Sequence, residues 1–320
     1  MIEFADACHY AAIVSVVTLP GLGAALGEGI VGGAALDAIN KQPSVKGEIA
    51  KNAILGMALV ETAAVIGIVI SFLLLLTPRL PENIFFTSLS HLGIAFAISI
   101  PGLVIGLASS LPAKEACLAI ARQPFFAQKI SRYMLIAQSI IQTPIILGFI
   151  IAMFIRNQAA TSTHIVDSIR LISSGAAIGF GSIGPAIGLA IFSQVACKGL
   201  GANRDAYNSV FSFTFISNAI VESPAIFALI ISLFLLRYSS SSYVTLDAFK
   251  MIGAALGISL STIGAGISSG ATAAAACKQI IQKPFLYGQL SKVSLFAQGM
   301  IDTCAIYALL ISLLLIIKVG

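Results

Sequence analysis

Residues 55–76 read LGMALVETAAVIGIVISFLLLL, an apolar stretch interrupted by a single acid. Glu61 is the only charged residue between Lys51 and Arg79. About 20 consecutive apolar residues are enough for a helix to cross the hydrocarbon core of a bilayer. The stretch therefore predicts a transmembrane helix that carries a carboxyl group near its middle.

The whole chain has the composition of an integral membrane protein. Its 320 residues are 58% hydrophobic and only 10% charged, whereas soluble domains carry roughly 25% charged residues. The net charge of +5 therefore points to orientation in a membrane and not to nucleic-acid binding. Long apolar segments predict eight transmembrane helices, at about 10–38, 49–77, 90–119, 130–156, 169–198, 208–237, 248–277 and 289–318. The predicted fold class is an all-α membrane protein.

These helices form four tandem hairpins of nearly equal length. The connections within the pairs read NKQPSVKGE (40–48), ARQPFFAQK (121–129), GANRDAYN (201–208) and IQKPFLYGQ (281–289). Arg204 stands where the other three loops have Pro43, Pro124 or Pro284. The predicted repeats are 1–80, 81–160, 161–240 and 241–320. Each repeat has an even number of helices, so all four point the same way across the membrane.

Basic residues concentrate at the loop end of the hairpins. Twelve of the 18 lie in these loops or their flanks: Lys41, Lys46, Lys51, Lys114, Arg122, Lys129, Arg132, Lys198, Arg204, Lys278, Lys283 and Lys292. Loops rich in Lys and Arg stay on the cytoplasmic side of a membrane. We therefore expect cytoplasmic hairpin loops and both termini on the outside, in a bacterial or archaeal inner membrane.

The two helices of each hairpin differ in the size of their side chains. The first helices carry glycines four positions apart, as in Gly23/Gly27, Gly102/Gly106, Gly175/Gly179 and Gly266/Gly270. Such spacing lets helix backbones approach closely. Two interpretations are open: the first helices pack against one another as an inner layer, or the glycines mark ordinary contacts of a compact bundle. The second helices are bulkier and fit a lipid-facing outer layer.

The position of Glu61 recurs through the repeats. The equivalent residues are Gln142, Glu222 and Asp302, each followed by Thr or Ser. A carboxylate in the middle of a bilayer costs roughly 2.5–3.5 kcal/mol on insertion scales. Without a basic residue at that depth, each acid must be protonated, bind a cation or meet a positive charge on another protein. A permanent hydrogen bond to Ser or Thr is the plain structural alternative.

A second acid lies at a similar depth on a first helix. Glu28 precedes the loop residue Pro43 about as far as Glu61 follows it, and the matching positions are Ser109, Leu189 and Ser269. We expect Glu28 to meet Glu61, either within one hairpin or between neighbouring hairpins. Two carboxylates in a dry site share a proton or coordinate a cation together. With the Thr62 hydroxyl, the set suits a hard cation such as Na⁺.

The combination resembles a known family. A Gly-rich first helix (GLGAALGEGI), a Gln-Pro loop (ARQP at 121–124) and a second helix with one mid-membrane acid (LVETAAVIGIVISFLLLL) are similar to the membrane rotor proteolipids of rotary ATPases. These are the c subunit of F-type ATP synthases and the K subunit of V/A-type ATPases. The similarity covers nearly all of the chain, four times over.

The resemblance implies a homo-oligomeric ring of hairpins that turns against a stator subunit, which supplies an arginine. It implies that Glu61, Glu222 and Asp302 carry H⁺ or Na⁺, with Glu28 and the hydroxyls of Thr62, Ser223 and Thr303 as ligands. It also implies that Gln142 carries no ion and that Na⁺, if used, is held by Glu28, Glu61 and Thr62. Central-stalk subunits would contact the loops near Gln42, Pro43, Gln123, Pro124, Arg204 and Pro284, and lipid would surround the ring.

The chain departs from the family pattern in two ways. Four fused hairpins are unusual, and only three of them carry an acid. Fewer carriers per turn give more force per ion, which favours pumping over ATP synthesis. A stand-alone proton-coupled transporter or channel with parallel repeats is the alternative, because Pro144, Pro185 and Pro224 are candidates for helix kinks. We find no motif for catalysis and expect no cofactor besides the transported ion.

Overall fold

The structure is a computed structural model that describes residues 2–77, 83–238 and 245–317. In these ranges eight helical spans are long and apolar enough to cross a membrane. The first helices of the hairpins are α1 (Ile2–Lys41), α4 (Ile84–Arg122), α7 with α8 (Ile165–Gly181 and Ile183–Leu200) and α10 (Thr245–Gln282). The second helices are α2 with α3 (Lys46–Val60 and Thr62–Leu75), α5 with α6 (Ala127–Ile141 and Thr143–Ala159), α9 (Tyr207–Arg237) and α11 (Tyr287–Ile316). The predicted all-α membrane fold is confirmed. The predicted repeat boundaries near residues 80 and 240 lie outside the described ranges.

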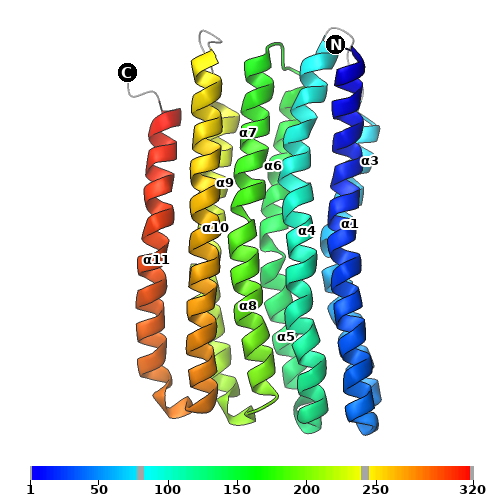
Figure 1. The fold of residues 1–320 in the computed structure, drawn as a ribbon, viewed down its shortest axis with the longest axis vertical. Coiled ribbons are helices and arrows are strands. Elements are labelled where there is room, and N and C mark those ends of the chain that lie inside the picture. Colours follow the sequence, from blue (N-terminus) through cyan, green and yellow to red (C-terminus); the bar gives the residue numbers. More distant parts are fainter. Residues whose placement is uncertain (1, 78–82, 239–244, 318–320) are drawn as a thin grey trace.

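The helices stand side by side in two rows (Figure 1). In one row α1 packs against α4, α4 packs against α7 and α8, and these pack against α10. Helices α3, α6 and α9 lie behind this row, and α11 stands beside α10 at its end (Figure 1). Each second helix packs against the first helix of its own hairpin. The start of α1 and the end of α11 lie at the same end of the molecule, as expected for an even number of spans (Figure 1). The first helices therefore pack against one another, as one of the two interpretations of the glycines required.

Glycine makes this row possible, because the backbones are in direct contact. A Cβ atom added at Gly270 of α10 would overlap the Gly188 backbone of α8. One added at Gly106 of α4 would lie 2.6 Å from the Gly23 carbonyl carbon of α1. No side chain fits at such distances, so each contact requires the missing Cβ on both helices. The repeated small residues thus determine which face of each first helix lies in the row.

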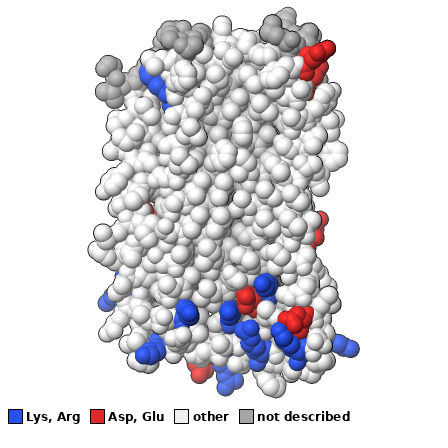
Figure 2. Space-filling model, viewed as in Figure 1, with Lys and Arg blue, Asp and Glu red and all other residues white. Residues whose placement is uncertain are grey.

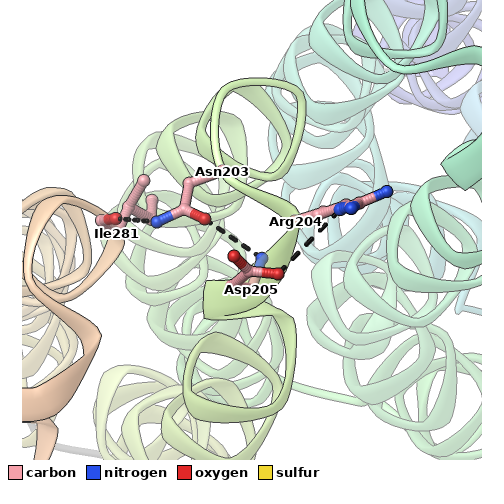
Figure 3. A network of polar contacts seen from close by, with 4 residues as sticks. All are labelled: Asn203, Arg204, Asp205 and Ile281. Atoms are coloured by element: carbon pink, nitrogen blue, oxygen red, sulfur yellow. Dashed lines mark hydrogen bonds and ion pairs between the residues drawn. The ribbon is translucent and has the colours of Figure 1, made fainter.

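Each hairpin turns through a short 3-10 helix. In three loops the turn begins with proline, as at Pro43–Val45, Pro124–Phe126 and Pro284–Leu286, where the fixed proline φ favours the first helical position. The third loop makes the same turn at Arg204–Ala206 without proline. There the Asn203 side chain accepts a hydrogen bond from the Asp205 backbone N–H at 3.0 Å and donates one to the Ile281 carbonyl at 2.8 Å (Figure 3). A side-chain cap thus takes the place of proline and also ties this loop to the end of α10.

Charged side chains gather at the loop end of the molecule. Figure 2 shows Lys, Arg, Asp and Glu clustered around the hairpin loops, below a broad band with almost no charge. Exposed apolar side chains of the second helices include Phe72, Phe234 and Leu310. A soluble protein would not expose so many large apolar side chains together, whereas a bilayer accommodates them. The second helices thus expose bulky apolar side chains of the kind that a lipid-facing row requires.

Two second helices are interrupted at the acid or amide position. The break between α2 and α3 falls at Glu61, and that between α5 and α6 falls at Gln142. At Gln142 the cause is Pro144, which has no backbone N–H to continue the ladder. A similar break at Ser182 precedes Pro185, while α9 runs without interruption through Pro224. The helix is therefore broken near two of the three prolines, and each break is confined to a single residue.

Candidate functional site

The four repeat positions occupy one depth in the second row. Glu61, Gln142, Glu222 and Asp302 each come at the same count from the start of the α-helix that follows the loop, at Lys46, Ala127, Tyr207 and Tyr287. At 1.5 Å per residue this count corresponds to about 22 Å along the helix axis. Their surroundings differ, because Glu61 is exposed in the isolated chain, Glu222 is half-buried and Asp302 is only 7% exposed. Gln142, Glu222 and Asp302 are more buried than Glu61 because the preceding hairpin packs beside each of them.

Each buried carboxyl meets a hydroxyl from the preceding hairpin. The Ser223 hydroxyl donates to Asp302 Oδ2 at 2.5 Å. Thr143 of the preceding hairpin lies near Glu222 in the corresponding way. The two contacts have the same separation along the chain, so one geometry is repeated at two hairpin boundaries. The serine or threonine after each acid therefore serves the acid of the following hairpin.

The Ser223 hydroxyl has one proton and two acceptors within reach. It lies 2.8 Å from the Ile220 carbonyl of its own helix as well as 2.5 Å from Asp302. When Asp302 is ionised, the hydroxyl donates to the carboxylate. When Asp302 is protonated, the acid donates to the serine oxygen while the serine donates to Ile220. The arrangement thus satisfies both charge states without moving a helix.

In the second hairpin, an amide occupies the position of the carboxyl. Gln142 is 4% exposed, and its Nε2 donates to the Leu59 carbonyl of α2 at 2.8 Å. An amide does not ionise near neutral pH, and the Gln142 amide already donates a hydrogen bond to the preceding hairpin. The geometry agrees with the prediction that Gln142 takes the place of a carboxyl without its chemistry.

The first-helix residues are only partly brought to the acids. Glu28 is half-buried and interacts electrostatically with Glu61, so the two acids approach each other within the first hairpin, and Thr62 directly follows Glu61. Ser269 is fully buried, and its hydroxyl has no hydrogen-bond partner among the described residues. Leu189 packs in the apolar core and offers no ligand to Glu222. Of the predicted ligand sets, only the one around Glu61 has a second carboxylate.

In the first and fourth hairpins, one member of the carboxyl–hydroxyl pair has no such partner among the described residues. The Thr303 hydroxyl donates to the Met300 carbonyl of its own helix at 2.6 Å, as Ser223 does to Ile220, but it donates to no carboxyl in the described ranges. No hydroxyl of the residues that the structure describes donates to Glu61. Within this part of the chain, Thr303 is therefore a donor without a carboxyl and Glu61 an acid without a hydroxyl.

The prediction from sequence omitted one hydroxyl and a row of amides. Thr143 was not among the predicted ligands, although it is the repeat equivalent of Thr62 and so follows from the period. One helical turn closer to the loops lie Gln138, Asn218 and Gln298, all at most 2% exposed. Gln138 donates to backbone carbonyls of α2 and α4, and Gln298 accepts from the Ser217 hydroxyl. The amide of Asn218, one methylene shorter, has no partner among the described residues.

In the described part of the chain, no group of three or more His, Cys, Asp or Glu side chains is arranged to hold a metal ion. Cys117, Cys197 and Cys277 recur at one position of successive repeats and are buried free thiols. At mid-depth the Asp302 carboxyl has a hydroxyl partner, Ser223. Such a pair binds and releases one proton or one small hard cation.

The sequence of the chain is similar to the sequences of known proteins. The profile of the family described as the C subunit of ATP synthase matches residues 11–74, 172–235 and 252–315, which are the three hairpins with an acid. The ATP synthase c subunit of Dehalococcoides mccartyi (strain CBDB1) is 43% identical over 70 residues, which are 22% of this chain and 92% of that protein. The ATP synthase c subunit of Chloroflexus aurantiacus (strain ATCC 29366 / DSM 635 / J-10-fl) is 34% identical over 67 residues, 21% of this chain and 88% of that protein. The A-type ATP synthase K subunit of Methanocaldococcus jannaschii is 27% identical over 232 residues, 72% of this chain and 97% of that protein.

Proposed function

The chain belongs to the family of ATP synthase C subunits, as a non-catalytic membrane rotor proteolipid of a rotary ATPase, and we infer that it carries ions on Glu61, Glu222 and Asp302. The observation that supports this most directly is the repeated pair of a mid-membrane carboxyl and a hydroxyl from the preceding hairpin. A carboxyl at this depth is stable when it is protonated or loaded with a cation, and it ionises when a positive charge approaches. In our proposal that charge is an arginine of the stator. Family membership also favours the rotor over a stand-alone transporter or channel.

We propose that several copies close into a ring, with α10 of one copy against α1 of the next. The free faces of these helices carry small residues at repeat positions that are contacts inside the chain. Gly264 of α10 corresponds to Gly184 of α8, and Gly29 of α1 corresponds to Gly270 of α10. A Cβ at Gly184 or Gly270 would collide with a neighbouring backbone, but nothing lies within 4 Å of one at Gly264 or Gly29. These two free faces can therefore approach each other as closely as the first helices do inside the chain.

The same junction would complete the first ion site. The register that brings Ser223 to Asp302 within the chain would bring Thr303 of one copy to Glu61 of the next. Glu61 would then be buried like Glu222 and Asp302, and all three acids would have a hydroxyl donor. Thr62, in turn, faces the position of Gln142, where no ion is carried.

The loop end of the ring is the proposed contact for the central stalk. The turns at Pro43, Pro124, Arg204 and Pro284 lie together at this charged end (Figure 2). By the distribution of basic residues we assign this end to the cytoplasm of a bacterium or archaeon, with the termini outside. The stalk would touch these loops near Gln42, Gln123 and their neighbours, while lipid covers the outer row.

We propose protons as the main cargo and ion pumping as the direction. A second carboxylate at the first-helix position, as Na⁺ would favour, occurs in the first hairpin alone, at Glu28, and Leu189 offers Glu222 no further oxygen. A sodium rotor needs the same ligands at every carrier, whereas a proton needs only the acid. Three acids on four hairpins mean fewer ions per turn, which suits transport against a steep gradient.

Labelling by a hydrophobic carbodiimide tests the proposal, because the reagent attacks a protonated carboxyl in an apolar site. We expect the purified protein to be labelled at Glu61, Glu222 and Asp302, with labelling that falls as pH rises and is unaffected by Na⁺. Protection by Na⁺ would make the cargo sodium. Absence of labelling at all three acids in folded protein would overturn the carrier assignment. Vesicles that synthesise ATP but cannot pump would refute the direction.

A further inference from the structure

A hollow opens on the lipid-facing row between the second helices of the two middle hairpins. Its volume is about 580 Å³, and it is lined by Phe154 and Gln158 of α6 and by Leu233, Phe234, Leu236 and Arg237 of α9. A second hollow of about 330 Å³ adjoins it at Phe154. Hollows of roughly 300–1,000 Å³ with mostly apolar walls and a few polar groups are typical ligand sites.

The polar groups lie at one end of the hollow. Gln158 and Arg237 are one helical turn beyond Phe154 and Leu233, toward the end of the molecule that carries the termini. The hollow therefore changes from apolar walls near the membrane interior to a cationic rim near the membrane surface. A phospholipid has the same gradient, with acyl chains below a phosphate.

Arg237 distinguishes this hollow from the equivalent places on the other hairpins. The equivalent residues of the other three hairpins are Leu76, Asn157 and Ile317, and none of them is charged. Arg237 is exposed, and within the described ranges its guanidinium makes no ion pair or hydrogen bond. The nearby Arg156, by contrast, donates from Nε to the Thr77 hydroxyl at 3.0 Å.

The location of Arg237 is also unusual for this chain, because most basic residues lie at the opposite, loop end. An arginine at the surface of a bilayer finds its counter-charge in lipid phosphates, which its planar guanidinium binds with two hydrogen bonds. From the hollow, the gradient and the unpaired cation, we propose that this groove binds one anionic phospholipid per chain. Its phosphate lies on Arg237 and Gln158, and an acyl chain lies along Phe154, Leu233 and Phe234. The inference does not depend on the nature of the transported ion.

Native mass spectrometry of the full-length protein tests the site. Delipidated protein receives phosphatidylglycerol or phosphatidylcholine in equal amounts. We expect one phosphatidylglycerol to be retained per chain, with at least roughly tenfold weaker retention in Arg237→Gln, the change expected for loss of a hydrogen bond between charged groups. Arg122→Gln serves as the matched control, since Arg122 is an exposed arginine at the loop end. Arg237→Lys, which keeps the charge, should retain most of the binding.

A second variant separates the groove from the charge. Phe154→Ala should weaken retention of both lipids, because it removes a wall shared by the two hollows. Inorganic phosphate should not compete, because it has no acyl chain. Equal retention of both lipids that is insensitive to Arg237→Gln would indicate an ordinary surrounding lipid and overturn the proposal. So would phosphatidylglycerol binding that falls equally in Arg122→Gln.

Discussion

Replacing one hydroxyl should change the titration of an acid in the next hairpin. In Ser223→Ala the Asp302 carboxylate loses the donor that lies 2.5 Å from its Oδ2. A hydrogen bond to a charged group contributes about 1.5–3 kcal/mol, and one pH unit corresponds to about 1.36 kcal/mol. The loss disfavours the ionised form, so Asp302 should stay protonated to a higher pH. Because the hydroxyl also accepts from the protonated acid, we expect the lower part of this range, an upward shift of roughly one pH unit.

Carbodiimide labelling followed by peptide mass spectrometry measures this shift for each acid separately. Glu222 is the control within the same chain, because its donor is Thr143 and not the adjacent Ser223. Thr143→Val is the matched variant, which should shift the labelling midpoint of Glu222 and leave Asp302 unchanged. If Ser223→Ala shifted Glu222 instead, the hydroxyl would act within its own hairpin and our interpretation of the geometry would be wrong. No shift in either variant would show that the hydroxyls do not distinguish the charge states.

Three further predictions concern assembly, capacity and packing. Thr303→Val should raise the labelling midpoint of Glu61 in the assembled ring but not in dissociated chains, and an equal shift in both would argue against a junction between copies. Gln142→Glu should increase the labelled acids per chain from three to four, as counted by intact mass; an unlabelled new glutamate in folded protein would show that its site is closed. Gly270→Ala should destabilise the protein by roughly 1–3 kcal/mol in thermal unfolding, because its Cβ would overlap the α8 backbone. Gly299→Ala, with nothing within 4 Å of the added Cβ, should be neutral, and similar losses in both would refute the packing argument.

The depth of the carriers was predictable from sequence because it depends only on counting. The regular period of the four hairpins maps Glu61 onto Gln142, Glu222 and Asp302, and a helix converts equal spacing into equal depth. The two rows were predictable for a similar reason, since small residues that recur on one face determine which backbones can touch. Both inferences use local periodicity and require no knowledge of how distant segments align.

The partner of each acid was not predictable in the same way. Sequence places Ser223 beside Glu222, but the structure pairs it with Asp302, in the next hairpin. That pairing depends on how far neighbouring hairpins are shifted and rotated relative to each other. The glycine contacts set this arrangement, but spacing along the sequence does not reveal it. The short side chain of Asn218 likewise reads as a conservative replacement for Gln138, yet its amide loses both backbone contacts.

The direction of the hydroxyl-to-carboxyl contact between hairpins bears on the symmetry of an assembly. Each carboxyl contact of this kind runs from a hydroxyl to the acid that follows it along the chain, so the two edges of the chain are unlike: Thr303 is a donor and Glu61 an acceptor. A two-fold axis that passed through a single edge contact would place like edges together, donor on donor, and would leave both acids without partners. Unlike edges join only head to tail, as a heterologous interface that closes when the rotation per copy divides a full turn. The direction of this contact, from a hydroxyl to the acid of the following hairpin, therefore favours the proposed head-to-tail ring about the membrane normal.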